Sequence, residues 1–91
     1  MTITLTEEEK AFVDRVEGYC AEGLDQPDMA KREEMSLGGF RAKLNRCGFA
    51  FDTKVERTLI RLKGTERYAD MKAKGQIVIE PEAHEPVPQP A

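Results

Sequence analysis

The chain has 91 residues, of which 40% are hydrophobic, 7% aromatic and 34% charged, and its formal net charge at pH 7 is -3. This length predicts one domain with a modest core and argues against a large catalytic cleft. The start of the sequence has no basic and apolar leader pattern, and no apolar run approaches the roughly 20 residues that cross a bilayer. We therefore expect a soluble, cytoplasmic protein with no membrane partner.

The charge is distributed unevenly along the sequence. Residues 1–34 include 4 basic and 10 acidic side chains, residues 35–74 include 10 basic and 4 acidic ones, and residues 75–91 include 3 acidic ones and no basic ones. A basic middle between two acidic ends is typical of a protein that presents one face to a polyanion. The alternative is the uneven charge of an ordinary helical protein.

The first predicted elements are a minor strand and a helix. Residues 2–5 alternate in a β-favouring pattern, and Thr6 and Glu9 have the spacing of a capping box. This predicts a helix over residues 7–21 that ends at Gly23. Its apolar stripe, at steps of three and four, consists of Phe12, Val13, Val16, Tyr19 and Cys20.

Two short helices follow, over residues 26–33 and 37–46. Asp25 and Ser36 are placed to cap them, Pro27 lies in a first turn, and Gly48 can end the second one. The residues expected to pack between them are Met29, Ala30, Met35, Phe40 and Leu44. The residues expected to face outward from the second are Arg41, Lys43, Asn45 and Arg46.

The remaining part of the chain is less regular. Residues 49–51 read as an apolar connector, and the capping-box spacing of Thr53 and Glu56 predicts a helix over residues 53–63 with Val55, Leu59 and Leu62 as its apolar stripe. The competing interpretation is a strand at residues 58–62 that forms the first strand of a wing.

Thr65 is the expected N-cap of a short helix over residues 66–73. Residues 76–80 have the strongest strand pattern of the chain, and this strand can pair with residues 2–5. Residues 81–91 contain four prolines and no periodicity, which predicts a disordered Pro/Glu tail.

The run from Met29 to Arg46 resembles the helix-turn-helix of bacterial transcription regulators, most closely region four of sigma factors and the C-terminal motif of LuxR-type regulators. The pairs that carry the resemblance are Met29-Ala30, Met35-Ser36 and Phe40-Arg41, followed by Ala42-Lys43-Leu44. It covers about a quarter of the chain. The resemblance implies a mainly α fold: a small trihelical helix-turn-helix domain over residues 1–80 with one or two extra C-terminal helices, and either a minor pair of strands or a wing.

The chain departs from these families at the turn. They carry an apolar residue and a glycine where this sequence has Glu33 and Glu34. A glutamate in the glycine position is strained if its φ is positive, and a buried glutamate is costly unless it points outward or is paired. The departure leaves open a differently shaped turn.

The resemblance implies that the helix over residues 37–46 enters the major groove of double-stranded DNA. Arg41 is then the candidate for a bidentate contact to guanine, Asn45 for adenine or phosphate, and Ser36 and the Gly38 backbone for a phosphate at the helix start. Lys43, Arg46, Lys54 and Arg57 are the candidates for backbone phosphates. We expect a homodimer, because one short helix reads too few base pairs for useful specificity.

Catalytic and metal-binding patterns are weak. His84 stands alone in the predicted tail, and Cys20 and Cys47 form no ligand set and fall on apolar helix faces, which favours buried free thiols. We expect no enzyme activity and no cofactor. The alternative to a sequence-specific DNA-binding regulator is a phage- or plasmid-type interaction module that binds a host nucleic-acid machine, such as RNA polymerase, through the acidic helix 7–21.

Overall fold

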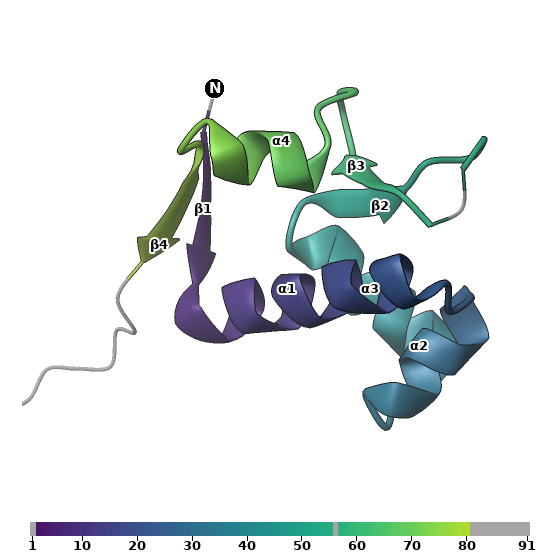
Figure 1. The fold of residues 1–91 in the computed structure, drawn as a ribbon. Helices are drawn as coiled ribbons and strands as arrows, with labels where there is room; N and C mark the ends of the chain where they lie inside the picture. The colour runs from purple at the N-terminus through teal and green to yellow at the C-terminus, as the bar shows by residue number, and fades with distance from the viewer. Residues whose placement is uncertain (1, 56, 81–91) are drawn as a thin grey trace, which may run out of the picture.

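The structure of the chain, a computed structural model, describes residues 2–55 and 57–80, and in this part it has four helices and four short strands (Figure 1). The helices are α1 (Glu7–Glu22), α2 (Gln26–Arg32), α3 (Leu37–Arg46) and α4 (Tyr68–Ala73). The strands are β1 (Ile3–Thr6), β2 (Phe49–Phe51), β3 (Leu59–Arg61) and β4 (Ile77–Glu80). Most of this regular structure is helical, in agreement with the predicted mainly α class. The predicted tail over residues 81–91 lies outside the described residues.

Helix α1 begins and ends as predicted. The Thr6 hydroxyl accepts a hydrogen bond from the Glu9 N–H (3.1 Å), and the Glu9 carboxylate accepts one from the Thr6 N–H (3.0 Å), which completes the capping box. At the other end, Gly23 has a φ of +84° and its N–H donates to the Cys20 carbonyl (3.0 Å). A left-handed residue at this position closes a helix at low cost only when it lacks a side chain.

Helices α2 and α3 have the predicted caps. The Asp25 carboxylate accepts a hydrogen bond from the Asp28 N–H (3.0 Å), and the Ser36 hydroxyl accepts one from the Gly39 N–H (3.1 Å). Pro27 lies in the first turn of α2, where it costs no backbone hydrogen bond. Helix α2 ends one residue before the predicted end, and α3 has the predicted bounds.

The connection between α2 and α3 is a short turn over residues 33–36. Glu34 has a φ of +58°, and it is the one non-glycine residue in the described part of the chain with a positive φ. The turn is held by backbone bonds from the Glu34 N–H to the Lys31 carbonyl and from the Met35 N–H to the Ala30 carbonyl, both 3.0 Å. The departure from glycine therefore leaves a strained glutamate, which costs roughly 1–2 kcal/mol for an L-residue in this region.

The predicted helix over residues 53–63 is wrong, and the competing strand is confirmed. β2 and β3 form an antiparallel hairpin in which Phe51 pairs with Leu59, so β3 is the second strand of the hairpin. Instead of capping a helix, the loop forms a turn in which the Lys54 N–H donates to the Asp52 carboxylate (2.8 Å). Val55 and Leu62 are 50% and 47% exposed, so of the expected stripe only Leu59 reaches the core.

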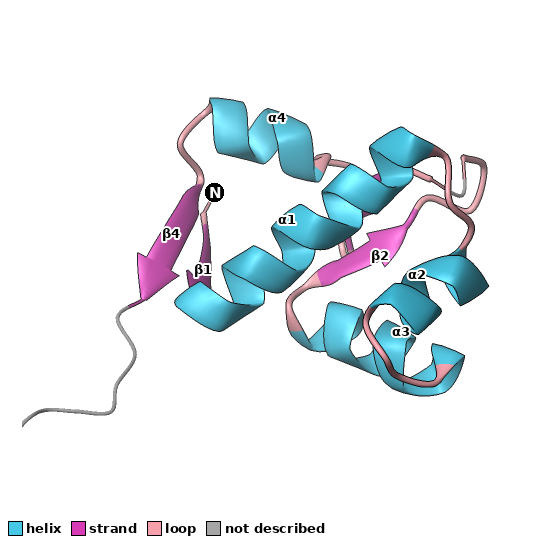
Figure 2. Cartoon of the chain, turned by 60° about the horizontal axis from the view of Figure 1, so that its bottom comes forward, coloured by secondary structure: helices cyan, strands magenta, loops and turns pink. Residues whose placement is uncertain are grey.

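The C-terminal elements complete the fold. Helix α4 starts two residues later than predicted, and its cap position is Arg67, which makes no side-chain capping bond, so the prediction for Thr65 as cap is wrong. β4 pairs with β1 as predicted, and the pairing is parallel, with Ile3 opposite Ile77. Figures 1 and 2 show this pair at one end of the molecule and α2 at the other, with α1 between them.

One core joins these elements. Edge-to-face ring contacts link Phe12 with Phe40 (5.8 Å between centroids) and Phe49 with Tyr68 (5.1 Å). The buried residues are Leu5, Phe12, Val13, Val16, Met29, Ala30, Phe40, Leu44, Cys47, Phe49, Leu59, Tyr68 and Met71. Within residues 2–55 and 57–80, none of the helices has the length and apolar character that a membrane span requires.

Candidate nucleic-acid interface

Helix α3 turns one side to the core and the opposite side to solvent. Phe40 and Leu44 are buried, whereas Gly38, Arg41 and Asn45 are exposed. The exposed residues are three and four positions apart, so they share one helix face. We call Gly38, Arg41 and Asn45 the α3 face.

The start of α2 supports the α3 face. The Arg41 Nε donates a hydrogen bond to the Gln26 Oε1 (2.7 Å), which ties the middle of α3 to the first residue of α2. Because this bond uses Nε, the terminal guanidinium nitrogens stay available for a second, bidentate partner. Gln26 therefore fixes the direction of the cation on this face.

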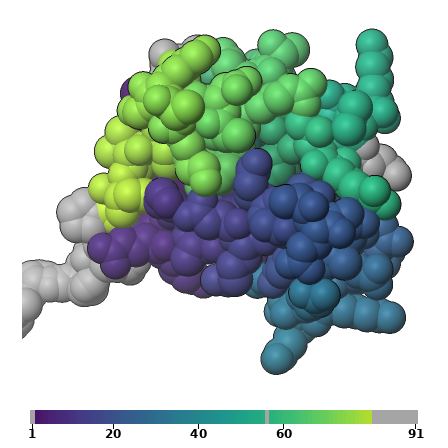
Figure 3. Space-filling view, in the orientation of Figure 1, coloured from purple at the N-terminus to yellow at the C-terminus, as the bar shows by residue number. Residues whose placement is uncertain are grey.

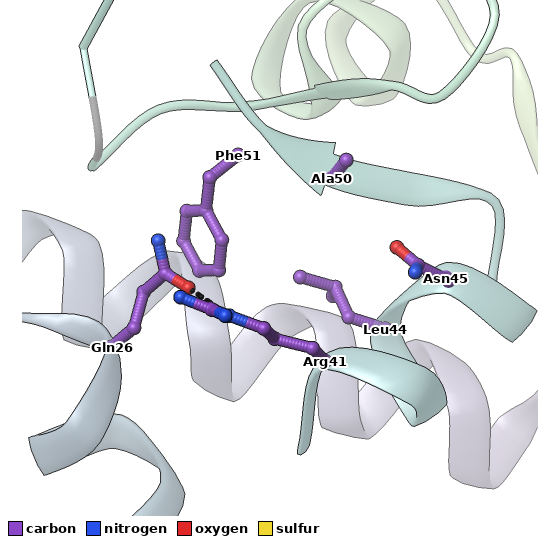
Figure 4. A pocket seen from close by; sticks show the side chains of 6 residues that line it. All are labelled: Gln26, Arg41, Leu44, Asn45, Ala50 and Phe51. Carbon is purple, nitrogen blue, oxygen red and sulfur yellow. Dashed lines mark hydrogen bonds between the residues drawn. The ribbon is translucent and has the colours of Figure 1, made fainter. Parts of the chain in front are cut away.

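A pocket of about 220 Å³ opens beside this pair (Figure 4). Leu44, Ala50 and Phe51 form its apolar part, and the polar side chains of Gln26, Arg41 and Asn45 line the rest. Figure 4 shows the Arg41 and Gln26 side chains meeting below the Phe51 ring. The arrangement offers an amide, a guanidinium and an apolar wall within one shallow site, a combination that suits the polar edge and methyl group of a nucleobase.

The first turn of α3 is open. A Cβ added to Gly38 would meet nothing within 4 Å, so there is open space beside the backbone at this position. Gly39 is different, because an added Cβ would lie 3.2 Å from the Ser36 Oγ that caps the helix. Ser36 itself is exposed and is the capping residue, so its hydroxyl already accepts one hydrogen bond.

Lys43 does not belong to the α3 face, and its expected outward position is wrong. Its ammonium lies 4.6 Å from the centroid of the Phe12 ring and 3.3 Å from the Glu8 carboxylate, and its side chain is only 22% exposed. The 100° step per residue puts position 43 beside the buried Phe40, where its stem covers the core. Lys43 therefore joins α3 to the start of α1.

The other predicted cations are spread over two neighbouring regions. Arg46, at the end of α3, lines a pocket of about 280 Å³ together with Arg61 and Lys63, which come from β3 and the turn after it. Lys54 is exposed in the β2–β3 loop. Arg57 lines a pocket with Val55 and Gln26, which places the loop beside the start of α2.

The α2–α3 turn is anchored on α1. The Arg15 Nε and Nη2 donate to the two carboxylate oxygens of Glu33, both at 2.9 Å, and the Tyr19 hydroxyl donates to Glu33 at 2.7 Å. The hydrogen bonds from Arg15 hold the pKa of the Glu33 carboxyl below its ordinary value. The same carboxylate raises the pKa of the Tyr19 hydroxyl. The Glu33 side chain is 8% exposed, so a charged carboxylate is buried here. Its bonds to Arg15 and Tyr19 offset the free-energy cost of that burial.

The chemistry of the cysteines fits a structural role. Both thiols are free, Cys47 is buried and Cys20 half-buried, which agrees with the expectation for Cys47 and in part for Cys20. Burial raises the pKa of each thiol to about 11, so both are protonated at neutral pH and weakly nucleophilic. Residues 2–55 and 57–80 contain no group of three or more His, Cys, Asp and Glu placed to hold a metal ion.

Sequence reasoning missed the residues that surround the expected ones. Gln26 and Phe51 line the pocket of Arg41 and Asn45, and Lys63 lies beside Arg46. Arg61 lines the same pocket as Arg46, and the charge distribution along the sequence does extend the basic region through it. Gln26 had one available signal, its position as the first residue of α2 after the Asp25 cap. The others depend on the hairpin, and the sequence of its first strand, Phe49–Phe51, predicts only a connector.

Comparisons of the chain with protein-family models, with curated proteins and with solved structures give no match.

Proposed function

We propose that the chain is a sequence-specific DNA-binding protein, a small transcriptional regulator in which α2 and α3 act as a helix-turn-helix. In this proposal α3 enters the major groove with the α3 face toward the base edges. Arg41 contacts guanine, and Asn45 contacts adenine or phosphate. The open backbone at Gly38 lies against a phosphate.

The observation that carries the proposal is the hydrogen bond between Arg41 and Gln26. An exposed arginine normally moves freely, and holding it costs side-chain entropy. Here a 2.7 Å bond from Nε holds it beside Asn45 and an apolar pocket wall. Pre-organisation of this kind lowers the cost of a bidentate contact.

The charge around the α3 face supports the same proposal. Lys54 and Arg57 come from the β2–β3 loop. Arg46 at the end of α3 and Lys63 in the turn after β3 line one pocket. Cations on both sides of α3, the proposed recognition helix, are placed to contact the phosphates that flank the groove. Their contribution to affinity falls steeply with salt.

The experiment is retention of the protein on mixed-sequence duplex DNA at low and at moderate salt. We expect salt-sensitive binding by the wild type. Substitution Arg41→Ala should reduce the affinity for a selected target by roughly 10-fold or more, since a bidentate pair contributes about 1–3 kcal/mol. The double variant Lys43→Ala/Arg46→Ala should lower the salt dependence through Arg46 alone.

The matched control is Arg67→Ala. Arg67 is also an exposed arginine, but it lies at the start of α4, where it forms an ion pair with Asp52 (3.6 Å) and lines a pocket with Arg57 instead of with Arg41 and Asn45. Its substitution should reduce the affinity much less than Arg41→Ala does. Absence of any salt-sensitive binding by the wild type would contradict the proposal. Equal losses of DNA affinity in Arg41→Ala and Arg67→Ala would show that α3 does not contact the bases.

The competing function is an interaction module that binds a nucleic-acid machine through the acidic helix α1. The structure gives this candidate less support, because several of its carboxylates already hold cations of the same chain. Asp14 binds Lys10 (2.6 Å) and Lys72 (3.4 Å), and Glu8 binds Lys43. A partner captured through α1 in the absence of DNA binding would favour it.

A further inference from the structure

Among the described residues, the outer edge of β4 has backbone groups without hydrogen-bond partners. The Ile3 N–H donates to the Gln76 carbonyl (2.9 Å), and this bond sets the phase of the parallel ladder. In that phase Val78 and Glu80 direct their backbone groups to β1, whereas Ile77 and Ile79 direct theirs to the opposite side. Within the described residues, no hydrogen bond to the backbone of Ile77 or Ile79 occurs on that side.

This edge has little of the usual protection: β4 is short and ends on Glu80, but its other three residues are apolar. The β1–β4 sheet has two strands of four residues each, and Figure 3 shows β4 in yellow-green at the rim of the molecule. No charge, proline or bulge interrupts the run from Ile77 to Ile79, and Val78 is 44% exposed. Proteins normally block such edges, because they pair with another strand. Two short strands alone also make a marginal sheet.

We propose that β4 of a second copy of this chain pairs antiparallel with β4 and joins two β1–β4 pairs into one four-stranded sheet. The choice of a second copy rests on the proposed function, in which two recognition helices are needed because one reads too few base pairs. The two-fold axis passes beside Val78, so Ile77 of one copy faces Ile79 of the other. This register gives four new hydrogen bonds, and it is the register that satisfies every open group of Ile77 and Ile79 with residues of β4 itself.

The side chains fit this self-pairing. Val78 faces Val78 of the second copy on the exposed side of the sheet, which buries two apolar groups. Glu80 faces Gln76 of the second copy, whose amide can donate to it, and the exposed Lys74 lies two residues further along. Among residues 76–80 no like charges stand directly opposite each other, so these pairs add no direct charge repulsion.

The first test is the oligomeric state of the full chain without DNA, measured by sedimentation over a range of concentrations. Position 78 faces itself across the axis, so Val78→Lys and Val78→Glu should each raise the dimer dissociation constant by at least about 10-fold, and mixing the two variants should restore a dimer. The control is Val55→Lys, in which an equally exposed valine in the β2–β3 loop is changed in the same way. It should dimerise as the wild type does.

The second test is amide hydrogen exchange of the wild type, which needs no variant. The Ile77 and Ile79 amides should become protected as concentration rises, whereas Val78 and Glu80, which bond to β1, should be protected in the monomer as well. A wild type that stays monomeric, or a dimer in which neither Val78 variant nor the Ile77 and Ile79 exchange responds, overturns the inference.

Failure of this inference and failure of the proposed function give different results. A monomer that still binds DNA through Arg41 removes this interface and leaves the function standing. A β4-paired dimer without salt-sensitive DNA binding leaves the interface and removes the function.

Discussion

The Glu33 carboxylate accepts two hydrogen bonds from the Arg15 guanidinium, both at 2.9 Å, and this pair joins the α2–α3 turn to the middle of α1. The turn thereby holds a charged residue whose side chain is only 8% exposed. Arg15 is about half exposed, so the pair is bonded at its buried end and hydrated at the other. Its charge-assisted geometry makes it stronger than an ordinary surface ion pair.

Substitution Glu33→Gln should lower the free energy of unfolding at pH 7 by about 1–3 kcal/mol, because the Arg15 and Tyr19 donors lose their charged acceptor. The folded-state pKa of Glu33 lies below its ordinary value of 4.5, so its contribution is present above that pH and is lost as the pH falls through the folded-state pKa. Denaturant titrations at several pH values should show the difference between variant and wild type shrinking in acid. A difference that is constant with pH would contradict this account.

Glu17 should have the opposite pH dependence. Burial raises its pKa, and its Oε1 is buried without a hydrogen-bond partner. A raised folded-state pKa means that the favourable contribution is present at low pH and is lost as the pH rises through that pKa. Glu17→Gln should therefore increase stability at pH 7 by up to about 1 kcal/mol and have a smaller effect in acid. A loss of stability at pH 7 would show that Glu17 has a charged partner.

The left-handed backbone of Glu34 predicts a stabilising substitution. Glu34→Gly should raise the free energy of unfolding by about 0.5–1 kcal/mol, since the relief of steric strain exceeds the added entropy of glycine in the unfolded chain. Glu34→Ala keeps the Cβ and serves as the control, because it should bring no such gain. Thermal unfolding of the two variants beside the wild type decides the point.

Two substitutions at Gln26 distinguish the effect of positioning Arg41 on DNA affinity from the effect of local charge. Gln26→Ala removes the bond to Arg41 and should weaken binding to a selected DNA by about 5-fold, which corresponds to the roughly 1 kcal/mol of one hydrogen bond. Gln26→Glu keeps Arg41 in place but adds a negative charge beside the phosphates, so it should weaken binding more than alanine does. Equal affinities of all three proteins would mean that Gln26 does not position Arg41.

Lys43 and Arg46 lie close together on α3 and should behave differently. Lys43→Met keeps a long stem over Phe12 and should leave the salt dependence of DNA binding unchanged. Arg46→Met should lower the slope of log affinity against log salt concentration by about 1, the value of one phosphate contact. A drop of the same size in Lys43→Met would show that the lysine leaves Glu8 when DNA binds.

The capped ends of α1, α2 and α3 could be predicted because each depends on a few neighbouring residues. Thr6, Asp25, Ser36 and Gly23 act within one turn of their own position, so the sequence contains the whole interaction. The β2–β3 hairpin could not be predicted with the same certainty. The spacing of Thr53 and Glu56 is that of a helix cap, and only the pairing of Phe51 with Leu59 decides against it.

The candidate site was predictable in part for a similar reason. Arg41 and Asn45 lie on the outer side of a helix whose bounds were clear. The direction of Lys43 depends on the Phe12 ring and Glu8 of α1, and the role of Gln26 depends on its contact with Arg41. Contacts between distant segments of this kind leave no local pattern.

The parallel pairing of β1 with β4 has a consequence for synthesis on the ribosome. Strands at opposite ends of the described chain must meet, so β1 emerges first and stays without its partner until almost all of the domain has been translated. Helices α1, α2 and α3 can pack before that moment, because they lie within residues 7–46 and contact one another directly, as Phe12 contacts Phe40. We therefore expect nascent chains that stop before residue 77 to hold a collapsed helical unit with an unpaired N-terminal strand, a species open to capture by chaperones.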